Sequence, residues 1–407
     1  MSKWETKTLE SLSEVITKGT TPTSIGFNFT ERGINFIKVE SIDFKGNFIA
    51  DKFAKISNEC HQALKRSQLQ ENDILFSIAG ALGRTAQVTK EVMPANTNQA
   101  LAIIRLKPSS DLFPKYIFHA LSSGVLIKQI EAQKAGVAQQ NLSLSQVKNF
   151  QIPIPPIEEQ KRIVEILDKA FEGIAQAEAN TRRNLINARE LFDSYLNQIF
   201  IQKKGDWETK TIADISTKIE YGSSSKSAQY ENNDSIPVLR MGNIQNGLIN
   251  WNDLVYTDRK DEIEKYSLQY NDVLFNRTNS DIHVGKSGIY KGERPAIFAG
   301  YLIRIHYKKE EINPDFLNFY LNSSIAREYG SSVMSRSINQ ANINGTKLKS
   351  YPIYIPSLPM QNKIVDSLYK LKNQAKKLET IYQRKLEAIA ELKQSILEKA
   401  FTGQLSQ

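Results

Sequence analysis

The amino-acid sequence predicts an α+β protein made of two tandem mixed α/β domains and two long helices. Three observations lead to this fold class. The chain repeats itself after about half its length, each copy mixes short β-like runs with helical patches, and each copy ends in a long amphipathic segment. A length of 407 residues also exceeds one ordinary domain.

Composition narrows the class of protein. Lys and Arg number 53 against 44 Asp and Glu, and the net charge of +9 favours a polyanionic partner. Cys60 is the one cysteine, which excludes an intramolecular disulfide framework and a cysteine-rich metal site. No apolar signal core follows Met1 and no run is long enough for a membrane span, so we expect a cytoplasmic protein.

The repeat is carried by short motifs that keep their order in both copies. The matched segments are Trp4 to Thr8 with Trp207 to Thr211, Leu69 to Phe76 with Leu268 to Phe275, Ile152 to Pro155 with Ile353 to Pro356, and Gln160 to Val164 with Gln361 to Val365. The offset is constant at 201 residues toward the end of each copy and drifts between 199 and 203 earlier. Loops of different length on one shared frame are typical of recognition.

Each copy begins with a mixed domain, at residues 1–155 and 204–356. In the first, residues 34–39 and 100–106 have the apolar pattern of strands, whereas Tyr116 to Ser122 is helical in pattern. Pro314 is expected to start a helix. Asn141 and Asn342 match across the repeat and precede helix-like segments, so we expect both to cap helices.

The second part of each copy, residues 156–203 and 357–407, is predicted to be one long helix following a proline stop. The expected apolar stripes are Ile163, Ile166, Ala170, Ile174, Ala177, Thr181, Ala188, Leu191, Tyr195 and Ile199, and Ile364, Leu368, Leu371, Ala375, Leu378, Tyr382, Leu386, Ile389 and Ile396. Each stripe needs a partner. Pairing within one chain gives an antiparallel coiled coil with pseudo-two-fold symmetry, and a coiled coil between chains is the alternative.

This layout closely resembles the specificity subunit of type I restriction-modification systems over essentially the whole chain. The motifs that carry the resemblance are Trp4 to Leu9, Asn72 to Phe76, Ile152 to Ile163 with its Ile-Pro-x-Pro-Pro-x-x-Glu-Gln run, and the ending Ala400 to Leu405. Ser357 to Gln361 departs from the pattern, although Gln361 is retained.

The resemblance implies two target-recognition domains, each reading one half of a bipartite DNA sequence, with the helical pair as the spacer between them. It implies two methyltransferase subunits docking on this chain and added restriction subunits. No cofactor is expected in the chain itself; S-adenosylmethionine belongs to the methyltransferase partner, and ATP and Mg to the restriction partner.

A run of glycine, a basic residue and a hydroxyl residue recurs in both copies, as Gly83-Arg84-Thr85 and Gly285-Lys286-Ser287. The second resembles the end of a nucleotide-binding P-loop, but Ser280 stands where that motif needs glycine. Two interpretations stay open: a hairpin turn in which glycine supplies positive φ and the basic residue is merely solvated, and a grip on DNA phosphate by backbone and cation.

The sequence gives no indication of catalysis. Asn313-Pro314-Asp315-Phe316 lacks the second proline of an adenine methyltransferase motif, and no acidic-basic pair follows it as a nuclease would require. The histidines His61, His119, His283 and His306 have no ligand spacing for a metal.

DNA reading needs Arg or Lys toward guanine or phosphate and Asn or Gln toward adenine. The candidate contacts are Lys38, Arg84, Gln99, Gln139 and Gln140 in the first domain, and Arg240, Arg277, Lys286, Arg336, Asn339 and Gln340 in the second. A free-standing nucleic-acid-binding protein without methyltransferase partners is the alternative function, and a pure coiled-coil adaptor is a third that the doubled mixed domains disfavour.

Overall fold

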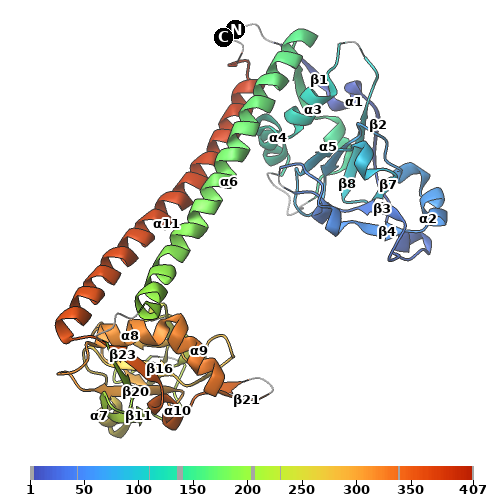
Figure 1. The fold of residues 1–407 in the computed structure, drawn as a ribbon. Helices are drawn as coiled ribbons and strands as arrows, with labels where there is room; N and C mark the ends of the chain where they lie inside the picture. Colours follow the sequence, from blue (N-terminus) through green and yellow to red (C-terminus); the bar gives the residue numbers. More distant parts are fainter. Residues whose placement is uncertain are drawn as a thin grey trace. The chain divides into compact units, whose positions relative to one another are not determined.

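The computed structural model describes residues 4–43, 45–109, 111–134, 141–202, 207–229, 231–337 and 340–405. The chain divides into two compact units (Figure 1): unit 1 is Met1–Thr181 with Arg384–Gln407, and unit 2 is Arg182–Gln383. Each unit therefore contains one mixed domain and a part of both long helices. The predicted domains are contiguous in sequence, whereas the compact units exchange helical segments.

The elements of the first copy are mostly short. Its strands are β1 (Glu5–Thr8), β2 (Ser13–Lys18), β3 (Ile34–Ile37), β4 (Ala54–Ile56), β5 (Ile74–Ser77), β6 (Thr85–Gln87), β7 (Ala95–Thr97), β8 (Leu101–Leu106) and β9 (Gln151–Ile154). Its helices are α1 (Leu9–Leu12), α2 (Asn58–Ala63), α3 (Pro114–Leu121), α4 (Gly124–Lys134), α5 (Leu144–Lys148) and the long α6 (Ile157–Ile201).

The second copy has the same order with additional strands. They are β10 (Glu208–Thr211), β11 (Ser216–Tyr221), β12 (Ile236–Leu239), β13 (Ile244–Gln245), β14 (Gly247–Ile249), β15 (Val255–Thr257), β16 (Val273–Asn276), β17 (Thr278–Asn279), β18 (Ser287–Ile289), β19 (Ile297–Phe298), β20 (Leu302–Tyr307), β21 (Ser335–Arg336), β22 (Ala341–Asn342) and β23 (Pro352–Ile355). Its helices are α7 (Lys260–Tyr266), α8 (Pro314–Asn322), α9 (Ser324–Val333), α10 (Gly345–Lys349) and the long α11 (Leu358–Phe401).

The two domains share one sheet topology. The order β2-β8-β5-β6 in unit 1 is repeated as β11-β20-β16-β18 in unit 2, and β4-β3-β7 is repeated as β15-β12-β19. In the smaller sheet the last pair is parallel in both copies. Unit 2 extends the larger sheet by β14 and β13 and adds a separate sheet of β17, β22 and β21. These results confirm the α+β class and the tandem repeat.

Each domain is closed by the repeated motifs at its two ends. Strand β1 pairs antiparallel with β9, placing Glu5 opposite Ile154, and β10 pairs with β23 with Glu208 opposite Ile355. The opening Trp-Glu-Thr-Lys-Thr segment therefore lies beside the Ile-Pro-x-Pro segment that leads into the long helix. The predicted strand at 34–39 ends earlier, at Ile37, because the hydroxyl of Ser41 accepts a hydrogen bond from the Lys38 N–H and the chain makes a single 3-10 turn.

A buried glutamine fixes the start of each long helix to its domain. The Gln160 amide oxygen accepts from the Phe113 N–H at 2.9 Å, while its nitrogen donates to the carbonyl oxygens of Asp111 at 2.9 Å and Pro155 at 2.8 Å. Gln361 makes the three equivalent bonds in unit 2. Both glutamines are fully buried, which explains why this residue is kept where the surrounding motif differs.

The two long helices run antiparallel inside each unit. In unit 1, Ile163, Val164 and Leu167 of α6 share a core with Leu397 and Phe401 of α11. In unit 2 the core contains instead the end of α6, including Leu196 and Phe200, and the start of α11, including Val365 and Leu368. Early residues of one helix thus meet late residues of the other in both units, which confirms the intramolecular antiparallel pair.

The predicted stripe residues of α11 are buried or half-buried, although at its two ends the fully buried side chains are Val365 and Leu397, next to the predicted Ile364 and Ile396. The stripe of α6 was placed wrongly near its end. Leu191 and Tyr195 are 41% and 38% exposed. Ala188 is buried as predicted, but beyond it the side chains that enter the core are one position further along, with Leu196 and Phe200 buried and Phe192 packed against them. Spacings of four along this segment keep the stripe on one side of a continuous helix.

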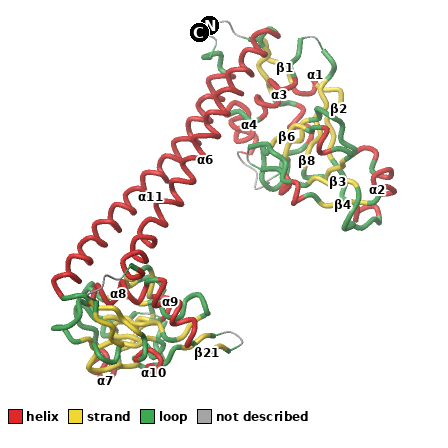
Figure 2. Tube along the Cα trace, viewed as in Figure 1, coloured by secondary structure: helices red, strands yellow, loops and turns green. Residues whose placement is uncertain are grey.

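The end of α11 returns to the beginning of the chain. The ring of Phe401 lies 5.0 Å from that of Tyr116 in unit 1, as Phe200 lies 5.3 Å from Phe316 in unit 2. Trp4 packs close to Gly403. Figure 2 shows the helical segments beside the strand-rich domain of each unit, with α3 and α4 next to α6 in unit 1.

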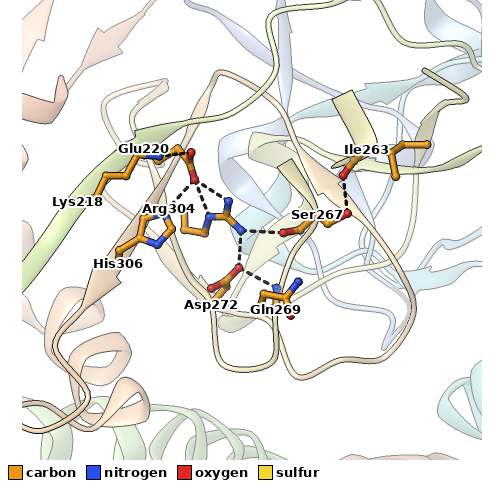
Figure 3. A network of polar contacts seen from close by, with 8 residues as sticks. All are labelled: Lys218, Glu220, Ile263, Ser267, Gln269, Asp272, Arg304 and His306. Atoms are coloured by element: carbon orange, nitrogen blue, oxygen red, sulfur yellow. Dashed lines mark hydrogen bonds and ion pairs between the residues drawn. The ribbon is translucent and has the colours of Figure 1, made fainter. Parts of the chain in front are cut away.

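An ion network explains the repeated Asn-Asp-apolar motif. The Arg105 guanidinium binds the buried Asp73 carboxylate through two bonds of 2.8 Å, and Arg304 binds Asp272 at 2.8 Å in the equivalent place. In unit 2, Glu220 also accepts from Arg304 at 2.6 and 3.0 Å (Figure 3). Burial opposes ionisation of Glu220, yet hydrogen bonds from Lys218, Arg304 and His306 lower its pKa to about 2.

Candidate nucleic-acid interface

The glycine loops of the two copies close the same hairpin with loops of different length. In unit 1, the Gly83 N–H donates to the Ser77 carbonyl at 3.0 Å and the Ser77 N–H donates to the Arg84 carbonyl at 2.8 Å. In unit 2, Gly285 and Lys286 make the same two bonds with Asn276, both at 2.8 Å. The frame is identical, while unit 2 has three more residues between these anchors.

Both glycines have the positive φ of the hairpin interpretation, 81° at Gly83 and 84° at Gly285. The Arg84 side chain donates to the carbonyl oxygens of Ile42 at 2.9 Å and Val39 at 3.3 Å, so it holds the neighbouring 3-10 turn. The glycine turn is therefore confirmed, but the expectation that the basic residue is merely solvated was wrong, because Arg84 and Lys286 are both half-buried. Contact with DNA phosphate stays a prediction.

The longer loop of unit 2 forms part of a small additional sheet. Strand β17 in this loop pairs with β22, and β22 pairs with β21, so the loop and a hairpin form one small sheet. Figure 1 shows β21 projecting from the body of unit 2. The exposed Arg336 at this hairpin donates to the Asp281 carboxylate at 2.9 Å, and the exposed Gln340 accepts through its backbone carbonyl from Ser337.

Arg277 lies at the base of the same loop. Its guanidinium carbon is 4.8 Å from the Tyr221 ring centroid, and one nitrogen donates to the Gly300 carbonyl at 3.1 Å. The Tyr221 hydroxyl in turn accepts from the Gly345 N–H. Arg277 thus holds loop segments together through its stacked side chain.

A basic cleft of about 590 Å³ lies between the helices and the domain of unit 2. We define it by its cations Lys286, Arg327, Lys372 and Lys376 and its apolar floor of Phe192, Leu248 and Phe319. Burial lowers the pKa of Lys286, Arg327 and Lys372, and the Arg327 charge lowers that of Lys286 further.

Two acids also line this cleft. Burial raises the pKa of Asp193, although Lys372 opposes this effect. Glu379 is paired with Arg189 at 2.6 Å. Cations therefore exceed acids in a partly desolvated site, an arrangement that attracts an anion. Arg327 and Lys372 were not among the residues predicted from the sequence. The sequence did contain one signal for Lys372: it lies four residues after Leu368, on the side of α11 that carries the apolar stripe.

The remaining candidates are dispersed. Lys38 lies over the Phe29 ring at 5.0 Å and pairs with Glu40 at 3.5 Å, and the exposed Gln99 accepts a hydrogen bond from Thr21. The exposed Arg240 donates to the Asp253 carbonyl at 2.9 Å beside a small polar cavity. Candidates that lie outside the described residues are Gln139, Gln140 and Asn339.

The predicted caps Asn141 and Asn342 were wrong by two positions. The N-caps are Ser143, whose side chain accepts from the Gln146 N–H, and Asn344, whose side chain accepts from the Lys347 N–H. Asn342 instead belongs to β22, where its side chain donates to the Thr278 hydroxyl at 2.6 Å. A side chain two residues outside the cap cannot reach the free N–H groups of the first turn.

Within the described ranges, no group of three or more His, Cys, Asp or Glu residues is arranged to hold a metal ion. None of the helices in the described part of the chain has the length and apolar content that crossing a bilayer requires. Cys60 is buried.

Comparison with known proteins identifies the family. The sequence model described as "Type I restriction modification DNA specificity domain" matches residues 1–188 and again 204–388. The type I restriction enzyme EcoKI specificity subunit of Escherichia coli strain K12 is 28% identical over 74% of this chain and 68% of its own length.

Two solved structures support the fold. A chain solved in work on complex assembly and conformational transition of the type I R-M system has a TM-score of 0.77 at 19% identity, covering 98% of both chains. The HsdS subunit from Thermoanaerobacter tengcongensis has a TM-score of 0.64 at 19% identity, covering 99% of this chain and 97% of that one. With the family match over both copies of the repeat, this chain belongs to the type I restriction-modification DNA specificity family.

Proposed function

We propose that this chain is the sequence-specificity subunit of a type I restriction-modification enzyme and reads a bipartite DNA target, one half-site per mixed domain. The observation that carries the proposal is one hydrogen-bonded frame present twice, with a different loop on each copy. A shared frame presents each domain to DNA in the same way, and different loops read different bases. It acts in the cytoplasm, where the DNA is.

In unit 2, the loop at residues 277–286, the β21–β22 hairpin and the basic cleft form the DNA surface. Lys286 and Arg327 in the cleft contact phosphates, because a cation in a partly desolvated cleft gains most from an anionic partner. Arg336 and Gln340, exposed on the hairpin, are suited to base edges. Lys286→Ala should weaken DNA binding by the assembled enzyme and reduce its salt slope by about one.

Two methyltransferase subunits dock on the long helices, and restriction subunits join that complex. The support is apolar surface that the helix pair leaves exposed, including Tyr195 at 38% and Met360 at 43%. In unit 2 these two side chains line a groove of about 370 Å³ with Ile199, Ile364 and Trp207. Uncovered apolar surface of this kind marks a protein interface.

The chain contributes no catalytic group. S-adenosylmethionine is bound by the methyltransferase subunits, and ATP and Mg by the restriction subunits. The segment that begins at Asn313 and partly matches an adenine methyltransferase motif supports this view, because its residues cap a helix or bind other side chains of the domain. Asn313 caps α8, Pro314 occupies its first turn, and Asp315 is paired with Lys291 at 2.8 Å and accepts from Tyr369.

The helix pair sets the distance between the half-sites. The support is that α6 and α11 are each one uninterrupted helix with residues in both units. Adding about one turn of four residues to α6 between Glu165 and Asn197, and the same to α11 between Asp366 and Glu398, should lengthen the unspecified spacer. An unchanged spacer in the methylated target would contradict this role.

Co-expression with the methyltransferase subunit of the same system tests the function. We expect the two proteins to purify together and to methylate a bipartite motif, detected by sequencing the host genome for modified bases. Specific DNA binding without a methyltransferase complex would support the free-standing alternative. Neither complex formation nor specific DNA binding would overturn both.

A further inference from the structure

Two positions of the repeat differ in a coordinated way between the long helices. With the constant offset of 201 residues, Phe171 of α6 corresponds to Lys372 of α11, and Phe192 corresponds to Lys393. Helix α6 therefore has phenylalanine at both positions, and α11 has lysine at both.

These residues contact each other across the helix pair in both units. In unit 1, the Lys393 ammonium lies 5.1 Å from the Phe171 ring centroid, and in unit 2 the Lys372 ammonium lies 5.7 Å from that of Phe192. The repeat relates the two contacts, because each joins position 171 or its equivalent to position 192 or its equivalent. A cation over an aromatic face is stabilising at this distance.

Both contacts are partly enclosed by the domains. His119 packs against Phe171 at 5.8 Å, and the equivalent Phe319 packs against Phe192 at 6.0 Å. The charged groups around Lys393 are Lys45, Asp43 and Glu178, and those around Lys372 are Lys376, Asp193 and Asp315. Burial lowers the pKa of both lysines, because it disfavours their charged forms.

Pairing either helix with a second copy of itself would lose these contacts. Two copies of α11 would place Lys372 against Lys393, two like charges in a partly desolvated place. They would also place Glu379 against Ala390 instead of Arg189, its partner at 2.6 Å. Two copies of α6 would place Phe171 against Phe192, with no charge to oppose association.

We propose that Phe171 and Phe192 on α6 and Lys372 and Lys393 on α11 form a pairing code. The partner that α11 fits is an α6 helix, and a second copy of α11 is disfavoured. The second half of the chain therefore takes the first half as its partner and rejects another copy of itself, so the two halves are not interchangeable as spacers.

Four full-length chains test the code: native, F171K/F192K, K372F/K393F and the variant with all four changes. The first variant opposes two lysine pairs, and the equilibrium constant for unfolding should rise about a hundredfold. Adding K372F/K393F to it restores cation and ring with the helices exchanged, and about tenfold should be recovered.

Self-association provides a second readout on the same chains. K372F/K393F removes the lysines that oppose an α11 pair, so its dimer fraction at tens of micromolar should exceed that of the native chain by light scattering. K370F/K385F changes two exposed lysines of α11 in the same way and is the matched control, expected to behave as native.

The two readouts test separate parts of the code. If the fourfold variant is no more stable than F171K/F192K, the contacts are not coupled and the proposal is overturned. If K372F/K393F shows no more dimer than the control, the lysines do not select the partner, and the selectivity is overturned. Neither measurement involves DNA or a methyltransferase subunit.

Discussion

Replacing Gln160 by methionine tests how the recognition domain holds its helix. Methionine has nearly the same shape, so the change removes hydrogen-bonding groups with little loss of packing. It leaves the Phe113 N–H and the carbonyl oxygens of Asp111 and Pro155 without the Gln160 side chain.

The structure gives the magnitude. Three hydrogen bonds of 2.8 to 2.9 Å end on a side chain that is fully buried. At about 1 kcal/mol net for each bond, the free energy of unfolding of unit 1 should fall by about 3 kcal/mol. The neighbouring Glu159→Met is the matched control, because the second copy already has Met360 there. It removes a helix-surface pair with Arg162 at 3.3 Å, worth about 0.5 kcal/mol.

Urea unfolding with native-state hydrogen exchange measures the effect. Exchange of the β1 and β9 amides reports unit 1 separately, since two units need not unfold together. Gln361→Met should repeat the result in the β10 and β23 amides of unit 2. A cost for Gln160→Met below about 1 kcal/mol, or a cost for Glu159→Met as large, would refute the reasoning.

Three further changes have defined outcomes. Burial lowers the pKa of His119 from 6.5 to about 4, so its contribution to stability is full above pH 6.5 and is lost as pH falls toward 4. His119→Phe introduces the residue type of the equivalent Phe319 and should abolish this pH-dependent loss, which is about 2 kcal/mol at pH 5, as measured by unfolding at several pH values. Glu220→Gln should cost about 3 kcal/mol in urea unfolding by leaving the buried Arg304 undercompensated, and should abolish a stability loss between pH 4.5 and 2. Arg336→Ala should weaken DNA binding, and Arg336→Lys should keep the salt slope but lose base discrimination if the contact is bidentate; equal binding and specificity in both variants would exclude Arg336 from the interface.

The repeated frame was predictable because its residues meet the same backbone and ion-pair requirements in both copies. Asn72 and Asn271 have φ of 69° and 71°, and the aspartate after each binds an arginine of the neighbouring strand. Such requirements fix residue types at fixed spacing, and spacing is visible in a sequence. The antiparallel helix pair followed from the same repeat, since two long apolar stripes on one chain need each other.

The candidate site was predictable only in part, because tertiary contacts decide what a polar side chain does. Arg84 and Lys286 occupy one repeat position, yet Arg84 binds backbone carbonyl oxygens of its own domain and Lys286 lines a cleft. Arg327 and Lys372 reach that cleft from α9 and α11, elements distant in sequence. The wrong placement of the α6 stripe has a similar origin, since Leu191 and Phe192 are equally apolar and only packing separates them.

Exchange of one domain tests the central claim most directly. Residues 207–356 would be replaced by the matching domain of a relative, and the chain co-expressed with its methyltransferase subunit while the modified bases of the host genome are mapped. Two specified blocks separated by unspecified base pairs are expected, with only one block altered by the exchange. Alteration of both blocks, or a single uninterrupted motif, would contradict the assignment of one half-site to each domain.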